Sequence, residues 1–263
     1  KKNDKLILKR VVELNHAKTA VIIPTASNYP EGLARDYFYV FKELGIENSH
    51  ILDIRERSDC DRPEFLEKIE LADLIFFTGG DQFRLVSTII DTTLFEKIKE
   101  KNLKGATIAG TSAGAAAACD PILFDGDYSG LQKGTTNYFR GFGFIKNITI
   151  DTHFVNRGRL GRLTQFLSSG HSKKGIGIGE NTAIIISPED TFEVVGSEMV
   201  TLVNTENISF SNYDKIQEKD PIVINDIRIG FLQHGSTFDL KEWKVLSSNG
   251  THQSSPEKVR IYN

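Results

Sequence analysis

The sequence has 263 residues, of which 39% are hydrophobic and 25% charged. This length suffices for one large domain or two small ones with a substantial core. The absence of any apolar run of about 18 residues excludes a membrane-spanning helix. A net charge of -3 argues against the broad basic surface that binds nucleic acids.

The two cysteines, Cys60 and Cys119, are too few for a disulfide framework and lack the C-x-x-C spacing of a zinc or redox site. A reducing compartment is the simpler interpretation, so we expect a cytoplasmic protein. The sequence begins at Lys1 without a recognisable signal peptide. A secreted protein whose signal peptide was removed before Lys1 is the alternative.

Short runs rich in Val and Ile predict buried strands, and helix-like segments separate the first of them. The predicted strands are 20–23, 51–54, 74–77, 106–109, 148–151, 176–178 and 183–186. The predicted helices are 31–44, 63–71, 82–90, 94–101 and 113–119. This alternation indicates an α/β fold with a mostly parallel sheet and helices on both faces.

The pattern changes after residue 182, where closely spaced strands are predicted at 192–195, 199–203 and 227–232. We expect them to add an antiparallel edge to the same sheet. No Pro-rich or Gly/Ser-rich linker interrupts the chain, so residues 1–263 are predicted to form a single domain. The polar segment 204–220 is predicted to be a long mobile loop.

The strongest chemical signal is Gly110-Thr111-Ser112-Ala113-Gly114, which follows a predicted strand and precedes an Ala-rich helix. This is the context of a nucleophile elbow, a strained turn that exposes its serine above a sheet. Gly110 and Gly114 would give the neighbouring backbone room to pass. The pattern favours Ser112 as a nucleophile, and the alternative is a turn in which Ser112 only caps the helix.

A nucleophilic serine needs a base, and His153 is the best placed of six histidines. It follows strand 148–151, and the carboxyl ends of parallel strands share one edge of a sheet. His234, in the turn after strand 227–232, is the reserve candidate. A metal site at Asp151 and His153 is less favoured, because further ligands at suitable spacing are missing.

The base in turn needs a carboxylate that orients it. Glu180 follows strand 176–178, whereas Asp125 and Asp127 lie in a predicted loop after the elbow helix. Spacing alone leaves these three acids open.

Two further segments are candidates for substrate contact. Gly80 lies in the loop that follows strand 74–77. The N–H groups of Gly80 and Ala113 are predicted to form an oxyanion hole. The alternative is that this loop is an ordinary turn between a strand and a helix. Arg157, Arg159 and Arg162 lie within six residues just after His153. Guanidinium groups form paired hydrogen bonds with carboxylates, so this run favours binding of a carboxylate-rich substrate. The alternative is a charged surface that only faces solvent.

Several motifs together resemble one family, the cyanophycinases, which are serine peptidases related to peptidase E, an aspartyl dipeptidase. The motifs are Pro24-Thr25-Ala26-Ser27, Phe77-Thr78-Gly79-Gly80-Asp81-Gln82, Gly110-Thr111-Ser112-Ala113-Gly114-Ala115, Asp151-Thr152-His153-Phe154, Arg157-Gly158-Arg159-Leu160-Gly161-Arg162 and Gly177-Ile178-Gly179-Glu180-Asn181-Thr182-Ala183. The resemblance spans residues 5–240.

The resemblance implies a flavodoxin-like fold akin to class I glutamine amidotransferases, and a homodimer. It implies that Ser112 is the nucleophile, His153 the base and Glu180 the third member, without metal or cofactor. Its substrate-binding positions are Gln82, Asp151, Thr152, Arg157, Arg159 and Arg162, although some members carry Gln where this chain has Thr152.

The function implied is a serine exopeptidase that hydrolyses cyanophycin, an arginine-bearing polyaspartate, to β-Asp-Arg dipeptides. The arginines would bind substrate carboxylates, and Asp151 would bind a substrate guanidinium. The alternatives are an aspartyl or isoaspartyl dipeptidase acting on another β-aspartyl peptide, and a binding homologue without catalysis. An α/β-hydrolase esterase is less favoured, because there the histidine follows the acid, whereas His153 precedes Glu180.

Overall fold

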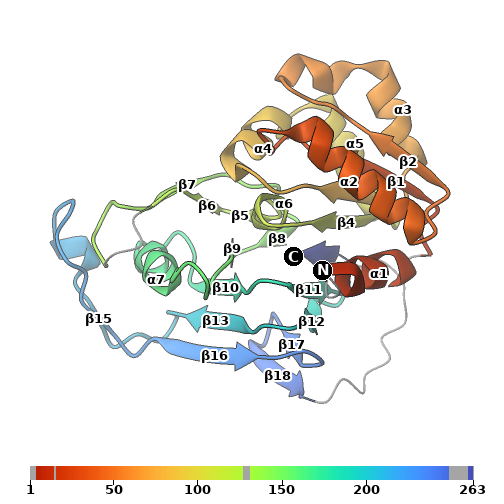
Figure 1. Cartoon of the computed structure of the whole chain (residues 1–263). Coiled ribbons are helices and arrows are strands. Elements are labelled where there is room, and N and C mark those ends of the chain that lie inside the picture. Colours follow the sequence, from red (N-terminus) through yellow and green to blue (C-terminus); the bar gives the residue numbers. More distant parts are fainter. Residues whose placement is uncertain (1–3, 15, 127–130, 249–259, 263) are drawn as a thin grey trace.

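A computed structural model describes residues 4–14, 16–126, 131–248 and 260–262. Its largest element is a nine-stranded sheet (Figure 1). The strand order is β18 (Lys244–Ser247), β17 (Thr237–Asp239), β12 (Thr191–Gly196), β11 (Thr182–Ile186), β19 (Arg260–Tyr262), β4 (Thr107–Gly110), β3 (Leu74–Phe77), β1 (Thr19–Ile23) and β2 (Asn48–Ile51). Strands β19, β4, β3, β1 and β2 are parallel, and the rest form the predicted antiparallel edge.

Helices cover the two faces of this sheet differently, and alternate residues of β1 show why. Ala20 and Ile22 pack with α1 (Asp4–Leu14) and α2 (Pro30–Glu43). Val21 and Ile23 face the opposite side. The helices on that side are α3 (Pro63–Leu71), α4 (Gln82–Ile89), α5 (Thr93–Leu103) and α6 (Ala113–Ala116). The predicted arrangement of helices on both faces is therefore confirmed.

A second, four-stranded sheet departs from the prediction of one sheet. Its order is β16 (Arg228–Leu232), β13 (Val200–Asn204), β10 (Lys174–Ile178) and β9 (Ile148–Thr152). Only β9 and β10 are parallel in it. Side chains of both sheets share one hydrophobic cluster, since Ile150 and Ile176 join Val21 and Ile184 there. On this ground we propose that the chain is a single domain.

Helix α7 (Leu160–Ser168) packs on the outer face of the second sheet, where two glycines of β10 make room. A Cβ at Gly175 would approach the Leu163 side chain to 2.8 Å, and one at Gly177 would come within 2.3 Å of the Phe154 ring. The glycines therefore let α7 and the segment after β9 lie directly on the strand.

Three two-stranded pairs and two 3-10 helices complete the described structure. They are β5 (Cys119–Asp120) with β8 (Ile145–Lys146), β6 (Ile122–Phe124) with β7 (Asn137–Phe139), β14 (Phe210–Ser211) with β15 (Ile224–Asn225), η1 (Arg57–Asp61) and η2 (Tyr213–Lys215). In the described residues, no helix is both long and apolar enough to cross a membrane.

Two local predictions were wrong. Strand β2 lies three residues before the predicted one, because after Ile51 the chain leaves the ladder to bury Leu52 and Ile54 as a loop. Helix α6 has four residues instead of seven, since the Ala117 and Ala118 carbonyls accept from the 142–145 segment. Segment 204–220 is mostly loop, as predicted, with β14, η2 and two carbonyls that accept from Lys133, and its mobility stays a prediction.

Candidate active site

The turn between β4 and α6 has the geometry of the predicted elbow. Ser112 adopts φ 52° and ψ -110°, a backbone conformation that side chains rarely occupy. A Cβ at Gly110 would lie 2.4 Å from the Gly114 carbonyl carbon, and one at Gly114 would lie 2.3 Å from the Phe77 oxygen. Both positions therefore require glycine, because the elbow brings backbone segments into direct contact.

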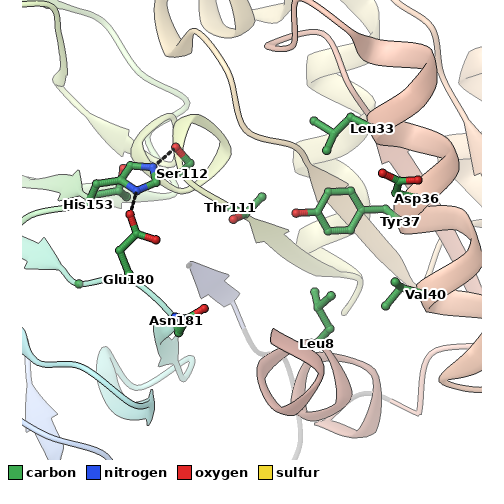
Figure 2. Close-up of a pocket in the computed structure, with 12 residues that line it drawn as sticks. Leu8, Leu33, Asp36, Tyr37, Val40, Thr111, Ser112, His153, Glu180 and Asn181 are labelled. Atoms are coloured by element: carbon green, nitrogen blue, oxygen red, sulfur yellow. Dashed lines mark hydrogen bonds and ion pairs between the residues drawn. The ribbon is translucent and has the colours of Figure 1, made fainter. Parts of the chain in front are cut away.

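The Ser112 hydroxyl points toward an imidazole (Figure 2). Its Oγ lies 2.7 Å from His153 Nε2, and His153 Nδ1 lies 2.8 Å from Glu180 Oε1. The alternative reading of Ser112 as a helix cap does not hold, because its side chain is directed at His153. Serine, histidine and carboxylate thus form one continuous chain of hydrogen bonds, which is the arrangement of a catalytic triad.

His153 reaches Ser112 from the other sheet, which corrects the expectation that both residues lie on one sheet edge. The carboxyl end of β9 meets that of β4 because the two sheets pack together. His153 has φ 53°, and the Phe154 N–H that follows it donates to Ile178 O at 3.1 Å. Phe154 is buried over Gly177, so the backbone on both sides of the imidazole is fixed.

Glu180 is held in a turn after β10 by its own backbone. Its N–H donates to Glu198 Oε2 at 2.8 Å, and its carbonyl accepts from Thr182 Oγ1 at 3.1 Å. Of the other acids that spacing left open, Asp125 accepts a hydrogen bond from Arg162 through its backbone carbonyl, whereas Asp127 lies outside the described residues.

The reserve histidine, His234, lies elsewhere. Its Nδ1 accepts from the Gly196 N–H at 3.4 Å, and its side chain lines a second cavity.

The loop before α4 lies directly against the elbow. A Cβ at Gly79 would come within 3.3 Å of Ser112 Cβ. Gly80 has φ 143°, and a Cβ there would clash with Ala26 O at 2.0 Å. Gly80 is therefore a position that only glycine fits, in the loop that contacts Ser112 through Gly79. The assignment of the Gly80 and Ala113 N–H groups to an oxyanion hole stays a prediction.

Asp151, Arg159 and Arg162, which the resemblance assigns to substrate binding, form a buried ion-pair cluster. Arg159 Nη1 donates to Asp151 Oδ1 at 2.9 Å, and Arg162 donates to both carboxylate oxygens at 3.0 and 2.5 Å. Asp151 is 2% exposed and Arg162 1% exposed. The start of α7 lies over β9, which brings the two guanidinium groups to the Asp151 carboxylate. Arg157 lies before the helix and is exposed.

Gln82 and Thr152 are the remaining predicted substrate contacts. The half-buried Gln82 side chain donates to Leu123 O at 2.6 Å. Thr152 is buried and lines a cavity of about 360 Å³ that also contains Ser112 and His153. The other lining residues are Leu8, Leu33, Asp36, Tyr37, Val40, Thr111, Gly179, Glu180 and Asn181.

Sequence reasoning missed the wall of this cavity that α1 and α2 provide, with Leu8 and Tyr37 facing the triad in Figure 2. The apolar spacing of residues 7, 8, 11 and 12 was the available signal for α1. Across the described residues, no group of three or more His, Cys, Asp and Glu side chains is arranged to hold a metal ion.

Comparison with known proteins identifies the family. The sequence model of peptidase family S51 matches residues 1–194. The chain belongs to peptidase family S51. It is 33% identical to the cyanophycinase of Geminocystis herdmanii, over 86% of this chain and 84% of that protein. It is also 33% identical to the cyanophycinase of Trichormus variabilis, over 86% and 76% of the two chains.

A solved structure agrees with this assignment. The crystal structure of a peptidase from an acI-B1 Actinobacterium superposes with a TM-score of 0.64 at 25% identity, covering 91% of this chain and 90% of that one. The predicted flavodoxin-like fold, akin to class I glutamine amidotransferases, is confirmed. So is the prediction of a serine-type peptidase.

Proposed function

We propose that this S51 peptidase is an exopeptidase that hydrolyses cyanophycin and releases β-Asp-Arg dipeptides. The observation that carries the proposal is the chain of hydrogen bonds from Ser112 through His153 to Glu180. Similarity to two cyanophycinases over most of the chain supports the substrate.

In the acylation step, Ser112 Oγ attacks a main-chain carbonyl of the polyaspartate. The released dipeptide keeps its β-linked arginine, so the bond that breaks is a backbone amide. His153 Nε2 accepts the hydroxyl proton as the Oγ–C bond forms, and the Glu180 carboxylate stabilises the resulting imidazolium. The N–H groups of Gly80 and Ala113 donate to the negative oxygen of the tetrahedral intermediate.

The intermediate then collapses, the amide C–N bond breaks, and the leaving amine takes the proton from His153. Water attacks the acyl-enzyme while the imidazole accepts one of its protons. Cleavage of the ester bond returns that proton to Ser112 Oγ. One water is consumed, and the products are a fragment with a new amine, a fragment with a new carboxylate and the regenerated enzyme.

Substrate recognition divides between exposed and buried groups. Arg157 is exposed four residues after His153, where its guanidinium binds substrate carboxylates. Thr152 adds a polar contact in the cavity that contains Ser112, and Gln82 adds another at the start of α4. Asp151, Arg159 and Arg162 act indirectly, because their buried ion pairs hold the end of β9 that carries His153.

Analysis of the released product tests this function. The purified protein is incubated with insoluble cyanophycin, and the soluble products are identified by liquid chromatography and mass spectrometry. We expect β-Asp-Arg dipeptides. Free arginine would contradict the assigned bond, and hydrolysis of Asp-X or isoaspartyl dipeptides without action on cyanophycin would favour the dipeptidase alternative.

We also propose a cytoplasmic homodimer. The exposed Ile229 and Phe231 on the edge strand β16 support an interface between two copies. Two buried free thiols, Cys60 and Cys119, support a reducing compartment. Light scattering of the purified protein tests the dimer, and fractionation of the source cells tests the compartment.

A further inference from the structure

A second cavity, of about 490 Å³, lies next to the segments that carry His153 and Glu180. It is bounded by the segment after His153, the turn between β12 and β13, and the turn after β16. The lining residues are Val155, Asn156, Gly196, Ser197, Glu198, Met199, Gln233 and His234. No step of the mechanism above uses this space.

Glu198 gives the cavity its charge, because it is the one carboxylate among the lining residues and no Lys or Arg accompanies it there. Its side chain is half-buried. One oxygen accepts from the Glu180 N–H at 2.8 Å and the other from Asn156 Nδ2 at 3.4 Å. Within the described part of the chain, Glu198 forms no ion pair with a cationic side chain. A partly desolvated carboxylate with only neutral donors favours a cationic ligand.

Glu198 links the cavity to the catalytic groups. Glu198 Oε2 contacts the backbone of Glu180, whose own carboxylate binds His153. Asn156 lies three residues after His153 on the chain. The cavity therefore adjoins the segments that carry His153 and Glu180, where a substrate of several linked units extends beyond the unit attacked by Ser112.

We propose that this cavity is an accessory subsite that binds the guanidinium group of a neighbouring arginyl unit of the substrate. Glu198 accepts hydrogen bonds from the guanidinium, while Val155 and Met199 pack along its methylene groups. The inference rests on the proposed function, because it requires a substrate that carries arginine on successive units.

Binding without turnover tests the subsite. The Ser112→Ala variant is titrated calorimetrically with a two-unit peptide, (β-Asp-Arg)2, and with two analogues in which one arginine is replaced by neutral citrulline. We expect one of the two replacements to weaken binding about fivefold, as for a partly exposed ion pair. Adding Glu198→Gln should abolish that difference.

Glutamine at position 198 keeps an oxygen that can accept from the Glu180 N–H, so it removes the charge with little change in shape. Glu47→Gln in the same background is the matched control, because it removes a charge from an exposed side chain that pairs with Lys18. This control should leave the arginine preference intact.

Turnover by enzyme with Ser112 intact gives the second readout. We expect Glu198→Gln to raise KM for the arginine peptide about fivefold and to leave KM unchanged for the citrulline analogue that lacks the recognised guanidinium. An equal loss of kcat on all three peptides, with the arginine preference retained, would overturn the subsite and leave Glu198 as a positioning residue for Glu180. Equal binding of arginine and citrulline peptides by Ser112→Ala would overturn it too.

The two proposals fail separately in these experiments. A charge-dependent arginine preference in binding, together with no hydrolysis of cyanophycin, would refute the proposed function and support the subsite. Hydrolysis of cyanophycin without that arginine preference would support the proposed function and refute the subsite.

Discussion

Two charged networks are built at the carboxyl end of the same strand, β9, yet they differ in exposure. Asp151 within β9 pairs with Arg159 and Arg162, which are almost fully buried. His153, one residue beyond β9, links Ser112 to Glu180, and the His153 and Glu180 side chains are 25% and 43% exposed. Two residues at the end of one strand thus contribute to a closed network and an open one.

The difference indicates which network holds the fold and which performs chemistry. A buried ion pair is locked, because removing one partner leaves an uncompensated charge in a region of low polarity. An imidazole in an open cavity can gain and lose a proton during each catalytic cycle and contact substrate. We therefore expect mutations in the open network to change activity, and mutations in the closed network to change stability.

The largest effect is expected for Ser112→Ala. Loss of the nucleophile should lower kcat on cyanophycin by roughly 10⁴-fold or more, because the partners of a triad act as a unit. The far-ultraviolet circular dichroism spectrum and the unfolding midpoint should match those of the unmodified protein. Turnover within tenfold of the unmodified enzyme would disprove the role of Ser112.

Glu180→Gln tests the orientation of His153 within the open network while leaving the nucleophile Ser112 in place. An amide in this position cannot stabilise the imidazolium, so kcat should fall by roughly 10²- to 10⁴-fold. The free energy of unfolding should change by less than about 1 kcal/mol, because the side chain is 43% exposed. An active Glu180→Gln enzyme would mean that another acid orients His153.

Asp151→Asn tests the closed network. We expect a loss of about 3–5 kcal/mol in the free energy of unfolding, because two buried guanidinium groups would lose their shared carboxylate. Chemical denaturation followed by tryptophan fluorescence measures it. The control is Asp53→Asn, which removes an exposed partner of Arg55 and should cost less than about 1 kcal/mol. Equal losses for the two variants would contradict the assigned difference.

Arg157→Gln sharpens the comparison, because Arg157 is the exposed member of the arginine run. We expect KM for cyanophycin to rise a few-fold, as for loss of one exposed ion pair, with no measurable loss of stability. Steady-state kinetics on soluble fragments measure the change. A destabilised protein with unchanged KM would instead place Arg157 with the buried arginines.

The smallest effect concerns Cys119, which lies beneath β9 with its sulfur accepting from the Ile150 N–H at 3.3 Å. Burial raises the pKa of the Cys119 thiol to about 12, so only about one in 10⁴ molecules carries the reactive thiolate at pH 8. Native protein should therefore resist alkylation by iodoacetamide at Cys119, whereas denatured protein should react. Peptide mass spectrometry measures both, and rapid native labelling would show that the region opens.

The sequence by itself determined the elements whose causes are local. The Val- and Ile-rich runs predicted β1, β3 and β4. The glycines around Ser112 predicted the elbow, because such a turn leaves no room for side chains at Gly110 and Gly114. The order of the motifs indicated the family, and with it Glu180, which spacing alone did not distinguish from Asp125 and Asp127.

The tertiary structure decided what depends on packing between distant segments. Only the stacking of two sheets shows that His153 reaches Ser112 from a different sheet. Only the position of α7 over β9 shows that Arg159 and Arg162 turn inward to Asp151 while Arg157 stays in solvent. The sequence of an arginine run does not predict whether its side chains are buried, because burial depends on the distant segments that folding packs against the run.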